Sequence, residues 1–129
     1  MSKCIVMYAD GDIVVADFPN NEHSKLVLVQ SIAQGAASIV NFTDFDGLPC
    51  ELWGNESGQE LGRGFNFAAS GLLEAEYPGN NGIFGDVLLL PEFSGTFWNG
   101  FDADKAVKFC KEIKFYVHVY LCRAMAAFN

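Results

Sequence analysis

Residue types that bind metals and nucleic acids are scarce in this chain of 129 residues. It has only two histidines, His23 and His118, and neither has further candidate metal ligands at short spacing. Eight lysines and arginines face 16 aspartates and glutamates, which gives a net charge of −8. An acidic body repels phosphate backbones and so argues against general nucleic-acid binding. We therefore expect no metal site, no cofactor and no direct contact with nucleic acid.

Paired cysteines and long apolar runs are also missing. The four cysteines, at positions 4, 50, 110 and 122, form no C-x-x-C pair and are irregularly spaced. The apolar stretch near the N-terminus is short and interrupted by Asp10, which is unlike a signal peptide, and no run approaches the ~20 residues of a membrane span. We expect a cytoplasmic protein with four free thiols. Two lysines near Cys110 could favour its thiolate, but a thiol on an apolar helix face is more typical of packing.

The apolar periodicity predicts an α+β fold: one compact domain over residues 1–129 with about five mostly antiparallel strands and two or three helices. Asp10-Gly11 between two apolar runs is typical of a hairpin. The expected strands cover residues 4–8, 13–18, 38–42, 50–53 and 83–90. The expected first two helices cover residues 22–34 and 65–75. The run 83–90 is hydrophobic throughout, which indicates a central strand buried on both faces.

The C-terminal segment shows two competing periods. Asp102 is a good N-cap, and a helical repeat runs through Ala106, Cys110 and Ile113 toward Ala124. Residues 113–121 also alternate between apolar and polar side chains, which is strand spacing. No glycine or proline separates the two patterns. We predict one long helix over residues 103–126, with a helix followed by a strand as the alternative.

That helix would carry more apolar side chains than one face can bury. The predicted outer face holds Phe109, Phe115, Tyr116, Val119 and Tyr120. A helix that is apolar nearly all round is normally covered on both sides, and a second copy of the chain is the simplest cover. The sequence thus predicts a possible homodimer. The alternative is that Phe93, Phe97 and Trp98 fold back over this face.

Glycines gather just before the second predicted helix. Gly62, Arg63 and Gly64 precede Asn66, which lies near the helix start. A glycine-rich loop that leads into a helix N-terminus can bind an anion, and Arg63 could contact it. The spacing is neither a P-loop nor a dinucleotide fingerprint. These four residues are the candidate ligand site, and a flexible loop is the alternative reading.

Charge is distributed unevenly along the chain. Residues 1–104 have a net charge of −12, whereas residues 105–129 have a net charge of +4. The basic segment either pairs with the acids of the body or offers a small anion site, and we favour the first interpretation. The pairs Asp10/Asp12 and Asp44/Asp46 fall where turns are expected, so we interpret them as turn residues rather than cation ligands.

The middle of the chain resembles a family of small proteins of unknown function encoded by phages and mobile elements. The similar pattern covers about residues 26–90 and runs without a gap from Asn55 to Ala69. Its residues are Leu28, Gln30, Gly35, Asn55, Glu56, Gly58, Gly62, Asn66, Ala69, Ile83, Gly85 and Asp86. The chain departs from the family at Ala36, where a second glycine is usual, and at Arg63-Gly64, where Leu-Pro is usual. The resemblance implies an α+β fold and a phage-related origin, and it supplies no catalytic residue.

No catalytic constellation stands out in the sequence. We therefore interpret the chain as a non-enzymatic binding protein that acts in the bacterial cytosol and blocks or modulates a host protein. Three alternatives stay open: a sponge for a small anionic ligand such as a nucleotide signal, an acidic mimic of nucleic acid, and an enzyme of unknown class.

Overall fold

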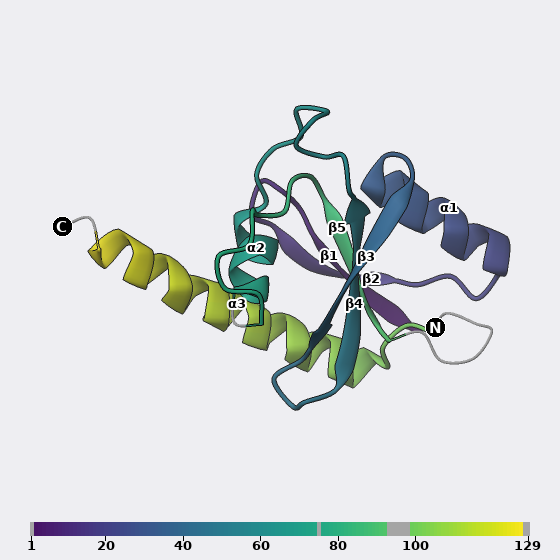
Figure 1. The fold of residues 1–129 in the computed structure, drawn as a ribbon. Coiled ribbons are helices and arrows are strands. Elements are labelled where there is room, and N and C mark those ends of the chain that lie inside the picture. The colour runs from purple at the N-terminus through teal and green to yellow at the C-terminus, as the bar shows by residue number, and fades with distance from the viewer. Residues whose placement is uncertain (1, 75, 93–98, 128–129) are drawn as a thin grey trace.

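One antiparallel sheet of five strands lies at the centre of the molecule (Figure 1). The computed structural model describes residues 2–74, 76–92 and 99–127. The strands are β1 (Lys3–Met7), β2 (Ile13–Asp17), β3 (Ala37–Thr43), β4 (Pro49–Asn55) and β5 (Val87–Pro91). Their order across the sheet is β2-β1-β5-β4-β3, and each neighbouring pair is antiparallel. The α+β fold and the central place of the most hydrophobic strand are confirmed.

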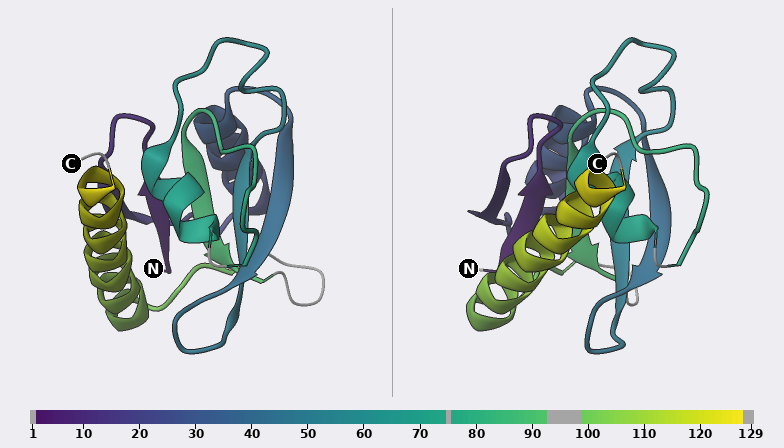
Figure 2. Two further views of the ribbon diagram at one scale, coloured as in Figure 1. Left: turned by 60° about the vertical axis from the view of Figure 1, so that its left-hand side comes forward. Right: turned by 90° about the vertical axis from the view of Figure 1, so that its left-hand side faces the viewer.

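Both faces of the sheet are covered, because successive side chains of a strand point to opposite faces. Helix α1 (Glu22–Ala33) covers one face, and helices α2 (Phe67–Leu73) and α3 (Ala103–Ala126) cover the other (Figure 2). The core under α1 is formed by Cys4, Val6, Phe18, Val29, Leu88 and Leu90. The core under α2 and α3 includes Ile5, Met7, Leu52, Val87, Leu89, Leu73, Phe109 and Ile113. Alternate side chains of β1 and β5 thus pack into the two cores.

The sequence placed most elements within a few residues of where they lie. The hairpin at Asp10-Gly11 joins β1 and β2, and Gly11 has a φ of +107°, which favours glycine. The predicted strand 83–90 starts later, at Val87. The reason is local: Gly85 has a φ of +92°, and the Asp86 carboxylate accepts the backbone N–H of Ala9 at 2.8 Å.

The long C-terminal helix is confirmed over Ala103–Ala126, and the helix-then-strand alternative is wrong. Asp102 caps the helix, because its side chain accepts the backbone N–H of Lys105 at 2.9 Å. After that first turn, no glycine or proline interrupts the helix. Residues 113–121 are therefore helical despite their alternating apolar and polar pattern. In the part of the chain that the structure describes, no helix is long and apolar enough to cross a membrane.

Strand β3 is an edge of the sheet, and its sequence carries no charged residue. Side chains that follow α2 bond two of its backbone groups. The Tyr77 hydroxyl donates to the Asn41 carbonyl at 2.6 Å, and the Glu76 carboxylate accepts the Thr43 N–H at 2.5 Å. The C-terminal half of this edge is therefore occupied by side chains.

Candidate functional site: an apolar groove on helix α3

The first half of α3 is held against the sheet. Ala106, Phe109, Cys110 and Ile113 are buried, at the i, i+3, i+4, i+7 spacing of a core-facing stripe. The second half contacts α2 through Tyr120, and its last turns extend beyond α2 and end away from the body (Figure 1). The candidate site lies where α3 changes from a buried helix to a projecting one.

Ion pairs fasten the β3–β4 hairpin to the first half of α3. Lys105 Nζ lies 2.8 Å from Asp44 Oδ2 and 3.0 Å from Asp46 Oδ2, and Lys108 Nζ lies 3.4 Å from Asp46 Oδ2. The Asp44 side chain is almost fully buried. Its hydrogen bond with Lys105 raises the pKa of that ammonium above its ordinary value, and the hydrogen bond from Lys105 holds the pKa of Asp46 below its usual range.

The same two aspartates also shape the hairpin turn. Asp44 Oδ1 accepts the backbone N–H groups of Asp46 at 2.9 Å and Leu48 at 2.8 Å. The turn interpretation of this pair is confirmed, as is the pairing of part of the basic segment with acids of the body. Phe45, between the two aspartates, is thereby placed over α3, with its ring centroid 5.9 Å from that of Phe109 and 5.6 Å from that of Tyr116.

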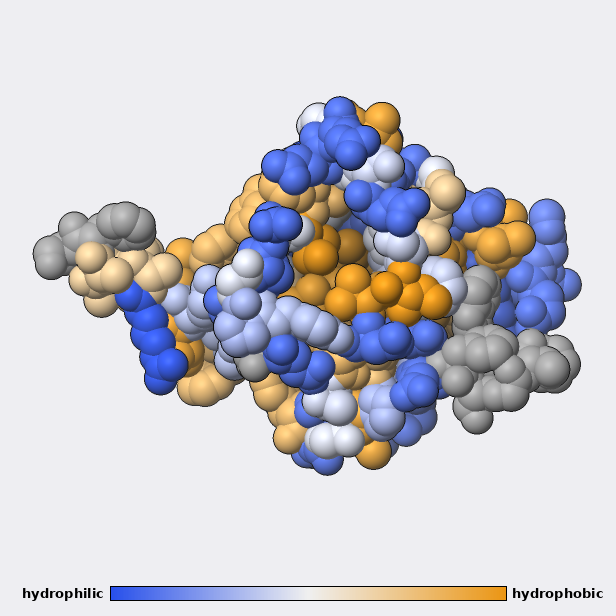
Figure 3. Space-filling view, in the orientation of Figure 1, coloured by the Kyte–Doolittle hydropathy of each residue, from blue (hydrophilic) through white to orange (hydrophobic). Residues whose placement is uncertain are grey.

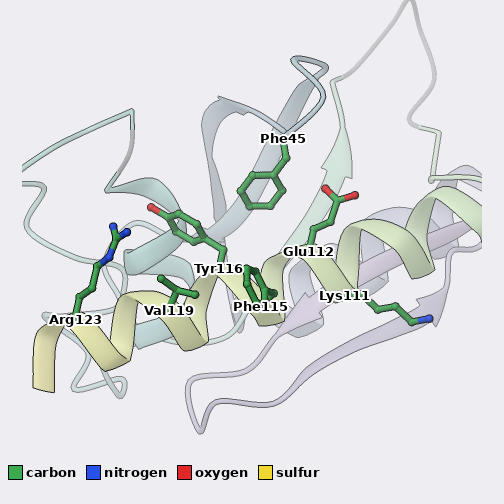
Figure 4. Close-up of a pocket in the computed structure, with 7 residues that line it drawn as sticks. All are labelled: Phe45, Lys111, Glu112, Phe115, Tyr116, Val119 and Arg123. Atoms are coloured by element: carbon green, nitrogen blue, oxygen red, sulfur yellow. The ribbon is translucent and has the colours of Figure 1, made fainter. Parts of the chain in front are cut away.

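An apolar groove of about 520 Å³ opens between this hairpin and the outer side of α3 (Figure 4). Its lining residues are Phe45, Lys111, Glu112, Phe115, Tyr116, Val119 and Arg123. Rings and aliphatic side chains form the middle of the groove. Glu112 and Arg123 lie toward opposite ends of it, as Figure 4 shows. Phe115 is 70% exposed.

Three of the five residues predicted for the outer face line this groove, namely Phe115, Tyr116 and Val119. The other two lie elsewhere. Phe109 is 1% exposed and belongs to the core, since the buried stripe of the helix is wider than the prediction assumed. Tyr120 faces α2: its ring centroid lies 5.4 Å from that of Phe67. The alternative cover, Phe93, Phe97 and Trp98, lies outside the described residues.

The other flank of the projecting half is apolar as well. Leu121 and Met125 are four residues apart, so they share a face, and they are 41% and 60% exposed. Leu121 follows the helical repeat that was expected to face the core, but the helix has left the body before this position. Val119 and Leu121 are about 200° apart around the axis, nearly opposite each other. Figure 3 shows apolar surface on this projecting part at the left of the view.

Of the four residues predicted for a ligand site at the glycine-rich loop, Asn66 is not accessible. Asn66 caps α2, as its predicted place near the helix start implied, but it is 0% exposed. Its side chain accepts the Ala69 N–H at 3.0 Å and donates to the carbonyls of Met7 and Gly85, each at 2.9 Å. Its hydrogen bonds connect β1, α2 and the segment before β5. In this structure Asn66 therefore has a structural role.

Arg63 and Gly64 line a small polar cavity of about 160 Å³. The Arg63 guanidinium donates to the side-chain oxygen of Gln34, and the Asp86 carboxylate lines the same cavity. Gly62 has a φ of +74° but does not line it. Ligand pockets for small molecules usually measure ~300–1,000 Å³. The small volume and the nearby carboxylate make this an unfavourable place for a nucleotide-sized anion.

Other residues of the family-like pattern also support the loop itself. Asn55 Oδ1 accepts the Ser57 N–H at 2.9 Å. A Cβ at Gly58 would lie 2.4 Å from the Phe84 carbonyl oxygen, so only glycine fits there. Close packing between the loop and the segment before β5 thus requires a glycine at position 58.

Three of the four cysteines are buried thiols, and all four are free. Burial raises the pKa of Cys4 to about 11 and that of Cys50 to about 12, and it also raises the pKa of Cys110. A raised pKa disfavours the nucleophilic thiolate. Cys122 is exposed, and its Sγ lies 3.7 Å from Nε2 of His118, which is also exposed. Among the described residues no three histidine, cysteine or acidic side chains are grouped to hold a metal ion.

Sequence reasoning missed Phe45, Glu112 and Arg123 as site residues. Phe45 was interpreted only as part of a turn, because nothing near it in sequence indicates that the turn packs against α3. Glu112 and Arg123 were noted only for their charge.

No protein-family model matches the chain, and no curated protein or solved structure is significantly similar to it.

Proposed function

We propose that this chain is a non-enzymatic binding protein that acts in a bacterial cytosol and blocks or modulates a host protein. Its contact surface is the projecting half of α3. The bacterial setting rests on the resemblance of residues 26–90 to small phage-encoded proteins. The sponge for an anionic ligand is less favoured, because the cavity beside Arg63 is small and lined by a carboxylate.

The observation that carries the proposal is the exposure of apolar side chains on more than one side of one projecting helix. Phe115 lines the groove, and Leu121 and Met125 lie outside it. Protein interfaces are enriched in aromatic residues, methionine and arginine, and this stretch contains all three. Recognition of an amphipathic helix by an apolar groove of a partner is a common mode, and here the chain would supply the helix.

A photoreactive amino acid at Met125 tests the proposal. In bacterial cells that express the variant, we expect irradiation to give a discrete adduct whose mass differs from twice the chain mass. A partner that binds this flank should be lost when Leu121→Glu is added, because an unpaired carboxylate in an apolar interface is costly.

The matched control places the same amino acid at Asp104, which is exposed on the first turn of α3 beside the body. Equal adducts from both positions would show non-specific capture. The absence of any adduct from Met125 other than the self-adduct would contradict the proposal.

A further inference from the structure

The charged residues of the α3 groove are arranged so that two copies of the groove would be complementary to each other. The proposed function does not depend on this arrangement. Glu112 lies near one end and Arg123 near the other, with Tyr116 and Val119 between them (Figure 4). A twofold interface needs this kind of self-complementary surface, because residue i of one copy meets residue j of the other and the reverse.

We propose that the groove is covered by a second copy of this chain, whose α3 packs antiparallel against it. The twofold axis passes between positions 117 and 118 of the two helices. This register sets Glu112 of each copy opposite Arg123 of the other. It also sets Tyr116 of each copy opposite Val119 of the other.

The spacing along the helix supports this register. Positions 112, 116, 119, 123 and 126 are separated by steps of 4, 3, 4 and 3, which is the seam of a heptad repeat. Glu112 and Arg123 are roughly 16 Å apart along the axis, at 1.5 Å per residue, so one antiparallel register aligns both charge pairs. The apolar residues Tyr116 and Val119 fill the layers between them.

Glu112 and Arg123 are both able to form these contacts with a second copy. The Glu112 carboxylate lies 3.7 Å from Lys108 Nζ, farther than a hydrogen bond, so it keeps acceptor positions for a guanidinium. Arg123 forms no ion pair with any other residue that the structure describes. A carboxylate and a guanidinium that meet at an interface form a charge-assisted hydrogen bond, which fixes the register.

The overall charge distribution favours the antiparallel direction. Residues 1–104 carry −12 and residues 105–129 carry +4. An antiparallel pair directs the two acidic bodies toward opposite ends and brings the Arg123 end of each helix beside the acidic body of the other copy. Phe45 would then close the groove over the turn of the second copy that contains Val119 and Arg123. A parallel pair would instead place like charges together.

A charge exchange tests the proposal by light scattering after gel filtration at micromolar concentration. The wild type should elute at about twice the chain mass of 14.1 kDa. Glu112→Arg and Arg123→Glu should each weaken the dimer by about tenfold or more, because each sets like charges opposite each other. The double variant Glu112→Arg/Arg123→Glu restores opposite charges and should recover the dimer.

Lys114→Glu is the matched control, since it reverses a charge on the far side of the same helix and should leave the dimer unchanged. Far-ultraviolet circular dichroism checks that each variant is folded, and both seam residues lie outside the core. A monomeric wild type, a dimer that neither single change weakens, or folded single variants that the double change does not rescue would each overturn the proposal. None of these results bears on the Met125 flank, so the proposed function is tested separately.

Discussion

The two halves of α3 are continuous in sequence and in helical geometry, yet they differ in what surrounds them. The first half is buried through Phe109 and Ile113 and is held by the ion pairs of Lys105. The second half, although richer in apolar residues than the first, projects with Phe115 and Met125 exposed. The helix thus continues without a break past the sheet, whereas burial depends on whether the sheet extends beneath it. An apolar helix face without a body beneath it indicates a binding surface.

The largest expected difference between the halves is in folding stability. Phe109→Ala should lower the free energy of unfolding by about 3–5 kcal/mol, because it leaves a cavity in the core. Phe115→Ala should change it by less than about 0.5 kcal/mol, because the ring is mostly exposed. Urea unfolding followed by tryptophan fluorescence at submicromolar concentration, where self-association contributes least, measures both. Similar losses of unfolding free energy for Phe109→Ala and Phe115→Ala would contradict the difference between the two halves of α3.

The second-largest effect on folding stability should come from the ion pairs of the first half of α3. Lys105→Met would leave the buried Asp44 carboxylate without its cation, which should cost about 2–3 kcal/mol of unfolding free energy. Lys108→Met removes a cation from exposed Asp46 and from the partly exposed Glu112, and should cost at most about 1 kcal/mol. If Lys105→Met were as mild as Lys108→Met in the same urea titration, Lys105 would not anchor the hairpin.

The smallest expected difference concerns the two cysteines of the helix. Cys110 is buried and its pKa is raised, whereas Cys122 is exposed. At neutral pH a thiol reagent should react with Cys122 faster than with Cys110 by about tenfold or more, since the thiolate is the reactive form and access is limiting. Mass spectrometry of the labelled protein gives both rates, and denatured protein should show four reactive thiols. Equal rates in the native protein would mean that the first half opens readily.

Much of the fold could be predicted because its signals are local. Asp10-Gly11 specifies a hairpin, the unbroken hydrophobic run 83–90 specifies a central strand, and Asp102 specifies a helix start. The full length of α3 followed from the absence of any breaker after that start. Ambiguity arose only where one run of residues satisfied both a helical and a strand period.

The site was harder to predict because it depends on contacts between distant parts of the chain. Nothing near Phe45 in sequence indicates that its turn packs on a helix more than 60 residues later. Asn66 was assigned to a ligand site and is instead buried, because its hydrogen-bond partners lie in β1 and before β5. Phe109 and Tyr120 were assigned to the surface because periodicity alone does not show how wide the buried face is.

The partly covered edge of β3 limits one way in which the protein could assemble. Its charge-free strand would otherwise be a template for strand addition, the step by which sheets from many molecules join into fibres. Glu76 and Tyr77 occupy the backbone groups of Thr43 and Asn41, so a further strand cannot pair along that half without displacing them. Strand addition without limit is blocked on this half of the edge, whereas a twofold contact between helices closes on itself. Assembly through α3 would therefore stop at two copies.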